Sequence, residues 1–242
     1  MSSLKQSNGP LTRLLILNSL LAIVILFSGC QETAGLKVEF KTAVSKHNYT
    51  IWTWSGINLD WTMTRPAAED QTIHMCIPAA CTEISNDRVK GAYSDNGNQP
   101  YPSRHIPSVG GVCIIENGKM RLLTKNEAKT DTDFLSNSAC DHFQLILIVK
   151  DGKPESFKDK KLLQRRALVL MADGAPAIIE TEQPASLAQF SYDLCELGAD
   201  RALYVDMGAW DEGWYRYGNG VIPIGRMKSA TERQSNWVVV KD

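Results

Sequence analysis

The sequence predicts an α+β fold: a single domain with a mixed central β-sheet, hairpins and a few packed helices. Short runs of apolar, aromatic and β-branched residues alternate with Gly, Pro, Asn and Asp along most of the chain, which is the pattern of strands and tight turns. One segment, 187–197, instead has apolar residues at helical spacing. The 242 residues are 43% hydrophobic, which is enough for one sizeable core.

Residues 1–29 have the pattern of a cleavable export signal. Lys5 and Arg13 precede an apolar run, Leu14–Phe27, and no acidic residue occurs before Glu32. This run is too short to span a bilayer comfortably, because a spanning helix needs about 20 apolar residues. A basic start followed by a short apolar run is typical of a signal peptide. The alternative is an anchoring helix that is never cleaved.

The segment Ser28-Gly29-Cys30 follows the apolar run and resembles the lipobox of bacterial lipoproteins. The resemblance implies that Cys30 becomes the lipidated N-terminus, since several acyl chains hold a protein stably on a membrane. Gln31, and not Asp, follows Cys30. By resemblance to lipoprotein sorting in Gram-negative bacteria, this favours the outer membrane over the inner one. We therefore expect an extracytoplasmic, lipid-anchored protein with a signal peptide at 1–29, a tether at 30–46 and one domain at 47–242.

Charge and motifs exclude several classes of function. A formal net charge of −1 gives no indication of a nucleic-acid partner. The sequence also lacks the motifs of nucleotide-binding proteins, zinc proteases and serine hydrolases, and we expect no cofactor. Five cysteines follow Cys30, an odd number that leaves at least one thiol free. Cys76 and Cys81 flank a turn, and the sequence leaves open whether they form a disulfide or remain two free thiols.

The strands are predicted from apolar runs between turn signals. Asn117-Gly118 is the strongest of these signals, because this dipeptide is typical of a two-residue hairpin. Phe143–Val149 is apolar except for Gln144, the pattern of one fully buried strand. The tether leads into a first strand through the alternating stretch 36–40. The other predicted strands are 49–54, 111–115, 120–123, 167–171, 177–179, 201–205 and 237–240.

The helix at 187–197 is marked at both ends. Ser186 is the predicted N-cap, Gln189 completes a capping box, and Gly198 is expected to end the helix in a left-handed conformation. The strand that follows ends at Asp206, a common place for chemistry in α/β arrangements. The alternative is that Asp206 only starts a turn. The apolar face expected to pack on the sheet consists of Leu187, Phe190, Leu194 and Leu197.

A series of segments in the second half of the chain resembles the phosphodiester glycosidase family. That family typically has an Arg-Thr-Ala-hydrophobic-Gly strand, then a helix ending in Leu-Gly, then Asp-Gly-Gly at a strand end. The chain departs from this pattern where Asp206-Met207-Gly208 lacks the first glycine, and where 75–81 lacks the family's asparagine. The matching segments are Arg165–Val169, Asp173-Gly174, Ser186–Phe190, Leu197–Ala199 and Ala202–Gly208.

The resemblance implies a site for a sugar-phosphate diester, which needs cations at the phosphate and carboxylates near the anomeric carbon. The implied catalytic residues are Asp206, Arg165 and His74. Alternatively, the arginines are exposed cations, the histidine is structural and the aromatic residues are core anchors. The metal requirement stays open. The implied substrate-binding residues are Arg166, Gly208, Trp210, Trp214, Tyr215, Arg216, Asp95 and Asn96.

We therefore expect an exported hydrolase that resembles enzymes cleaving sugar-1-phosphodiester linkages in glycans. Its partners would be the glycan substrate and, through Cys30, the membrane, with no nucleic acid. The alternative is a non-catalytic glycan-binding envelope lipoprotein that keeps the cleft but not the chemistry. The two departures from the family pattern favour this alternative, whereas Asp206 and Arg165 favour the enzyme.

Overall fold

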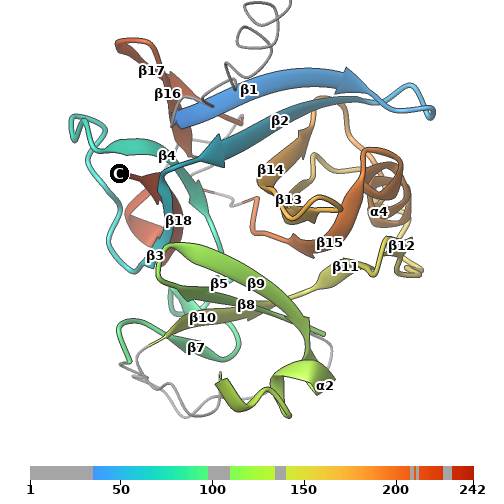
Figure 1. Ribbon diagram of the computed structural model, residues 1–242, viewed down its shortest axis with the longest axis horizontal. Coiled ribbons are helices and arrows are strands. Elements are labelled where there is room, and N and C mark those ends of the chain that lie inside the picture. Colours follow the sequence, from blue (N-terminus) through green and yellow to red (C-terminus); the bar gives the residue numbers. More distant parts are fainter. Residues whose placement is uncertain (1–34, 98–109, 134–139, 208–209, 211–212, 226–230) are drawn as a thin grey trace, which may run out of the picture. The chain divides into compact units, whose positions relative to one another are not determined.

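The computed structural model describes residues 35–97, 110–133, 140–207, 210, 213–225 and 231–242. The described chain is mostly β, with eighteen strands, two α-helices and one 3-10 helix (Figure 1). All strand pairs within it are antiparallel. The predicted α+β fold around a mixed sheet is therefore wrong.

The largest sheet has seven strands, and its first strand begins within the expected tether. Across the sheet they are β1 (Gly35–Thr42), β2 (Asn48–Ser55), β14 (Pro176–Thr181), β13 (Arg166–Met171), β15 (Ala199–Tyr204), β11 (Leu147–Lys150) and β12 (Lys153–Pro154).

Three smaller sheets complete the fold. One has five strands: β17 (Gly220–Pro223), β16 (Trp214–Tyr217), β4 (Ile73–Pro78), β18 (Trp237–Lys241) and β3 (Asn58–Thr62). Another has four: β7 (Tyr93–Ser94), β10 (Asp141–Leu145), β8 (Gly111–Glu116) and β9 (Lys119–Thr124). The last pairs β5 (Thr82–Glu83) with β6 (Arg88–Val89), and the helices are α2 (Lys125–Ala128), α4 (Leu187–Glu196) and the 3-10 helix η1 (Thr231–Arg233).

The connection through α4 explains why the predicted mixed sheet does not form. A strand-helix-strand unit usually returns the chain parallel to the strand that it left. Here β15 runs in the same direction as β14, but β13 lies between them and pairs antiparallel with both. The crossover through α4 therefore adds an antiparallel pair.

The predicted buried strand over 143–149 is divided between two sheets. Its first part is β10 of the four-stranded sheet, and its second part is β11 of the seven-stranded sheet, with Ile146 between them. Gly111 of β8 lies at this crossing. A Cβ atom there would lie 2.5 Å from Leu203 Cδ1 and 2.9 Å from Leu147 Cβ. An apolar run gives no sign of such a division, because both parts are buried.

Helix α4 forms as predicted and packs on one face of the seven-stranded sheet (Figure 1). Phe190 and Leu194 are fully buried. Ser186 Oγ accepts from the Gln189 N–H at 3.1 Å, and Gly198 has φ +98°. Only half of the predicted capping box forms, since the Gln189 amide donates to Asp193 within the helix.

The opposite face of the seven-stranded sheet packs against the two other large sheets. Trp52, Trp61 and Phe143 come from three different sheets and lie in one buried cluster. None of the five described cysteines forms a disulfide, so Cys76 and Cys81 are not bonded to each other. No described helix is long and apolar enough to cross a membrane.

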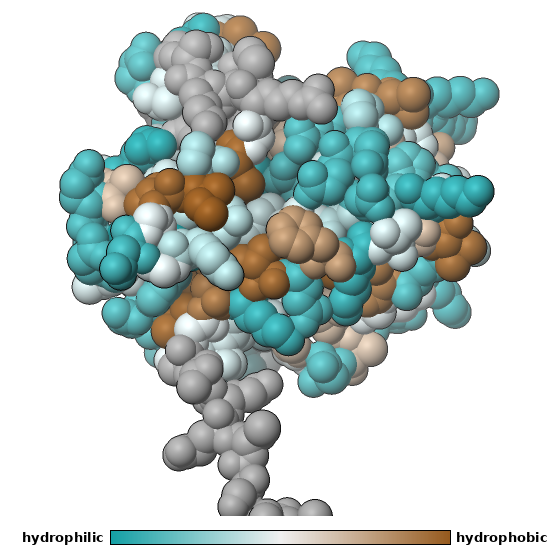
Figure 2. All heavy atoms as spheres, turned by 90° about the horizontal axis from the view of Figure 1, so that it is seen from above, coloured by the Kyte–Doolittle hydropathy of each residue, from teal (hydrophilic) through white to brown (hydrophobic). Residues whose placement is uncertain are grey.

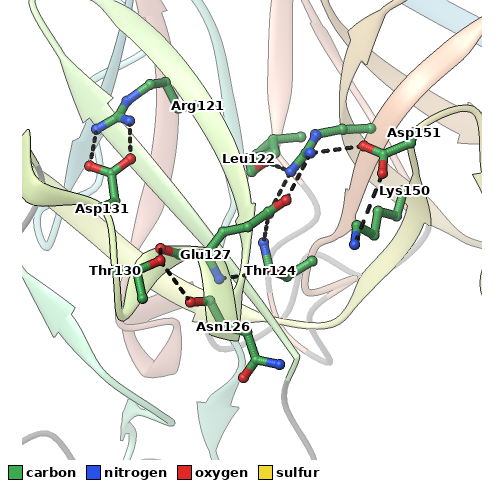
Figure 3. A network of polar contacts seen from close by, with 10 residues as sticks. Arg121, Leu122, Thr124, Asn126, Glu127, Thr130, Asp131, Lys150 and Asp151 are labelled. Carbon is green, nitrogen blue, oxygen red and sulfur yellow. Dashed lines mark hydrogen bonds and ion pairs between the residues drawn. The ribbon is translucent and has the colours of Figure 1, made fainter.

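Arg201 ties β15 to the four-stranded sheet (Figure 3). Its guanidinium donates to Glu127 of α2 at 2.7 and 3.0 Å, to the Leu122 carbonyl at 2.9 Å and to Asp151 at 2.9 Å. Glu127 also accepts from the Thr124 N–H at 2.7 Å and so completes the capping box of α2. The hydrogen bonds with Arg201 hold the pKa of Glu127 at about 2.

Candidate functional site

Arg165 and Asp206 lie at the same end of the β13–β15 pair. The register pairs Ala167 with Tyr204, so Arg165 and Asp206 each lie two residues beyond a paired position. Arg165 Nη1 donates to the Tyr204 hydroxyl at 3.3 Å. Burial raises the pKa of Tyr204, the Arg165 charge opposes this rise, and the Asp206 charge adds to it. The antiparallel register therefore places a cation and a carboxylate at one end of this strand pair.

The guanidinium of Arg165 is nevertheless occupied by the protein itself. Nε donates to the Ala185 carbonyl at 3.1 Å, and Nη2 donates to the Lys161 carbonyl at 2.8 Å. Arg165 is 3% exposed, and its guanidinium carbon lies 5.6 Å from the centre of the Tyr204 ring. These hydrogen bonds hold neighbouring loops together, and the guanidinium of Arg165 is therefore not open to a phosphate group.

Asp206 faces the loop that follows β4. Its N–H donates to the Ala79 carbonyl at 2.8 Å, and its carboxylate accepts from the Thr82 N–H at 3.2 Å. Burial, and then the Asp206 charge, raise the pKa of the Cys81 thiol to about 12. The thiol beside Asp206 therefore stays protonated and is a poor nucleophile at neutral pH.

His74 is not brought to Asp206. It lies near the start of β4, where its Nε2 is 2.7 Å from Oδ1 of Asp242. Asp206 instead contacts Ala79, five residues further along the chain. An extended segment of that length spans roughly 16 Å.

The aromatic and arginine residues after Asp206 have mixed surroundings. Trp214 is 2% exposed within a small core, which fits the alternative that it anchors the fold. Arg216 donates to the carbonyls of Ile73, Ala68 and Asp70 at 3.2, 2.8 and 3.0 Å. The ring centre of Trp210 lies 4.3 Å from the guanidinium carbon of Arg233. Two other predicted residues, Gly208 and Cys30, lie outside the described residues.

Asp95 and Asn96 belong to the turn after β7. Asn96 has φ +50°, its N–H donates to Asp141 Oδ1 at 2.6 Å, and its amide donates to Asp95 at 3.0 Å. Burial raises the pKa of Asp141, while the Asn96 N–H lowers it. These contacts give both residues a local structural role in the four-stranded sheet.

A cavity of about 320 Å³ opens elsewhere, between the seven-stranded sheet and the β16–β17 hairpin. Strand pairing aligns Phe40, Thr50, Glu180 and Arg166 as one row across four strands. Of the predicted site residues that the structure describes, only Tyr215 lines the cavity. The lining residues are Phe40, Thr50, Trp52, Gln164, Glu180, Glu182, Tyr215, Ile222, Pro223, Ile224 and Gly225.

Arg166 lies beside this cavity as the partner of Glu180. Its side chain is fully buried, and Nε donates to Glu180 Oε2 at 2.7 Å. Gln164 donates to the other oxygen of Glu180 at 2.6 Å. Glu182, two residues after Glu180, is exposed and accepts a hydrogen bond from the Thr50 hydroxyl. Alternation along an extended chain places both carboxylates on the same side.

Two aromatic rings form the apolar part of the cavity lining. Trp52 and Tyr215 meet edge to face, with ring centres 5.7 Å apart and planes at 63°. Burial first, and then the charges of Tyr217 and Glu182, raise the pKa of the Tyr215 hydroxyl. The cavity thus combines aromatic surface with carboxylate, amide and hydroxyl groups.

Sequence reasoning missed Glu180 and Glu182. Their signal is the Glu-Thr-Glu that ends the apolar strand from Ala177, because alternation places both carboxylates on one side. The groups that complete the cavity come from β2 and β16, far away in the sequence. No group of three or more His, Cys, Asp or Glu suited to a metal ion occurs among the described residues.

Comparisons with known proteins reveal a shared fold. No family model matches the chain, and no curated protein sequence matches it. The catalytic domain of zebrafish N-acetylglucosamine-1-phosphodiester alpha-N-acetylglucosaminidase, auto-inhibited by its pro-peptide, aligns with a TM-score of 0.59 and 10% identity. The match covers 86% of this chain and 83% of that domain. This is a distant likeness of fold.

A hypothetical protein from Synechocystis also has a similar structure, with a TM-score of 0.53 and 13% identity. The match covers 85% of this chain and 61% of that protein. The resemblance to phosphodiester glycosidases that the sequence suggested is thus supported at the level of a distant fold relationship.

Proposed function

We propose that this protein is a glycan-binding lipoprotein of the bacterial envelope, with its ligand in the cavity beside β14 and β16. The main support for this proposal is a cavity of about 320 Å³ whose lining includes Trp52, Tyr215, Glu180 and Glu182. Aromatic rings provide apolar surface for sugar rings, and carboxylates accept hydrogen bonds from sugar hydroxyls. Its volume lies within the range of small-ligand pockets, about 300–1,000 Å³.

The contacts of the predicted catalytic and substrate-binding residues favour binding over hydrolysis. Arg165 and Arg216 donate to backbone carbonyls, and His74 bonds to Asp242. A phosphate group would have to displace these partners, at the cost of leaving the carbonyls without their donors, including the buried carbonyl of Ala185. Envelope attachment rests on the signal-like segment 1–29 and on Cys30.

Hydrolysis of a sugar-1-phosphodiester at Asp206 is the second candidate. It is favoured by the position of Asp206 beside Arg165 at one sheet end. The fold is also shared with a domain named as an N-acetylglucosamine-1-phosphodiester alpha-N-acetylglucosaminidase. This candidate predicts turnover that is lost in Asp206→Asn without loss of folding.

Calorimetric titration with a panel of glycan oligosaccharides tests the leading proposal. Tyr215→Ala should abolish binding, because it removes one wall of the cavity. Tyr217→Ala is the matched control, since Tyr217 is on the same strand, is 69% exposed and is not a lining residue. Thermal melting checks folding of both variants.

A parallel hydrolysis assay with sugar-1-phosphodiesters separates the two candidates. Binding without turnover supports the leading proposal. Turnover that depends on Asp206 supports the second candidate instead. Absence of both would contradict any glycan role for this chain.

A further inference from the structure

The charge of the cavity indicates which glycans fit it. Its described lining residues include two carboxylates and neither Lys nor Arg. Arg166 neutralises Glu180 from beneath, with Nε at 2.7 Å. Within the described residues, no ion pair joins Glu182 to a cation, and its hydrogen-bond donor is the neutral Thr50 hydroxyl. Among the described residues, one negative charge at the cavity therefore has no cationic partner.

The aromatic rings of the cavity favour the same kind of ligand. The faces of Trp and Tyr rings carry negative electrostatic potential and attract cations. Tyr215 is half-buried and lines the cavity beside Trp52, which is 1% exposed, and their ring centres are 5.7 Å apart. The charge of Glu182 contributes to the raised pKa of Tyr215, so the carboxylate and this ring share one local environment. The carboxylate of Glu182 and the ring of Tyr215 both stabilise a positive charge placed there.

We propose, building on glycan binding in this cavity, that the ligand carries a protonated amine, as in a hexosamine unit without its N-acetyl group. The ammonium group donates to Glu182 and lies near the aromatic rings, which gives a charge-assisted hydrogen bond. A phosphodiester in the same place meets the negative charge of Glu182 and is repelled. The cavity therefore selects against the substrate that the family resemblance implied.

The test measures calorimetric affinity of the full chain, purified in detergent, for three probes. These are a glucosamine tetrasaccharide, its fully N-acetylated counterpart, and the methyl phosphodiester of N-acetylglucosamine-1-phosphate. We expect the amine-bearing tetrasaccharide to bind about tenfold more tightly than the others, as one charge-assisted hydrogen bond would provide.

Glu182→Gln keeps the size and hydrogen-bonding capacity of the side chain but removes its charge. It should weaken binding of the amine-bearing probe about tenfold more than it weakens binding of the N-acetylated probe, because only the amine-bearing probe loses a charge-assisted hydrogen bond. Glu155→Gln is the matched control, because Glu155 is also exposed but does not line the cavity. If Glu182→Gln fails to fold, the salt dependence of the wild type replaces it, since added salt should weaken binding to an exposed carboxylate.

The outcomes distinguish this inference from the proposed function. Equal affinity for both tetrasaccharides, insensitive to salt and to Glu182→Gln, would overturn the amine preference and leave glycan binding intact. Preference for the phosphodiester would overturn the inference in favour of the family's substrate class. If none of the probes or the wider oligosaccharide panel binds, the proposed function itself fails.

Discussion

Glu180 and Arg166 form an ion pair that is buried between neighbouring strands, at 4% and 0% exposure. Glu180→Ala would leave a guanidinium buried without its charge partner, so we expect a loss of about 3–5 kcal/mol in the free energy of unfolding. Urea denaturation measures this loss. The double variant Glu180→Leu/Arg166→Met should lose much less, because it removes both charges. Equal losses for the two variants would contradict the account.

His142 predicts a pH dependence of stability. Burial in β10 lowers its pKa from 6.5 to about 4. Between those values the unfolded chain binds a proton that the folded chain does not, so stability falls as pH falls from about 6.5 to 4. His142→Gln should reduce this slope, measured as the free energy of unfolding at pH 7 and pH 4.5. An identical slope in the variant would show that other groups cause the acid sensitivity.

The roles of the arginines could not be predicted from residue type. An Arg at the head of a strand is a reasonable phosphate ligand, and Arg165 is in that position. Its partners, however, are carbonyls of Lys161 and Ala185, and those of Arg216 include Ala68 and Asp70. Backbone carbonyls have no signature in a sequence, so only the folded structure distinguishes a clamp from a binding site.

Helix α4 is stabilised mainly by the face that it buries. Phe190 is fully buried and stacks on Tyr49, with ring centres 6.2 Å apart. Phe190→Ala should therefore destabilise the protein by about 3–5 kcal/mol, the range for a buried aromatic residue. Tyr192→Ala on the same helix is the control, because Tyr192 is 55% exposed. A loss below about 1 kcal/mol for Phe190→Ala would contradict the packing of this face.

One carboxylate, that of Glu127, stabilises helix α2 in two ways. Glu127 caps the helix at Thr124 and pairs with Arg201 of β15 (Figure 3). Glu127→Ala should cost about 1–2 kcal/mol in thermal or urea unfolding, because it removes both the cap and the partly exposed ion pair. Glu127→Gln keeps a capping group and should cost less. A larger loss of stability in Glu127→Gln than in Glu127→Ala would contradict the assignment of these two roles to Glu127.

Elements with signals at their own ends were predictable. The Asn117-Gly118 hairpin forms with φ +51° and +74°, and α4 begins and ends where its caps indicate. The run 143–149 was not resolved into two strands, because its two parts pair with different strands, β8 and β15, that are distant in the sequence. Local chemistry thus predicts where strands turn, but a largely apolar run does not reveal a change of sheet.

At the scale of the whole molecule, the cavity depends on topology. Its lining comes from β1, β2, β14, the β16–β17 hairpin and the residues beside them. The face that carries β1 and β17 shows hydrophobic patches separated by hydrophilic residues (Figure 2). Phe40, a lining residue on β1, is 74% exposed there. The order of the strands brings these residues together, and that order could not be predicted from hydrophobic periodicity.

The N-terminal segment predicts attachment of the protein to the membrane through Cys30. The basic start, the apolar run 14–27 and Ser28-Gly29-Cys30 predict cleavage before Cys30 and acylation of its thiol and amine. Because one acyl chain gives only reversible binding, stable membrane association requires the multiple chains of a mature lipoprotein. Mass spectrometry of protein from its native envelope should therefore find a mature chain that begins at an acylated Cys30.

Cys30→Ser provides the control for this prediction, since it removes the thiol that accepts the lipid. The variant should accumulate as an unlipidated precursor, while Cys195→Ser, on α4, should leave processing unchanged. Membrane fractionation followed by mass measurement distinguishes these outcomes. An unmodified wild-type N-terminus that retains Met1 would contradict the assignment of a lipoprotein. The proposed location in the bacterial envelope would then lose its support, whatever the cavity binds.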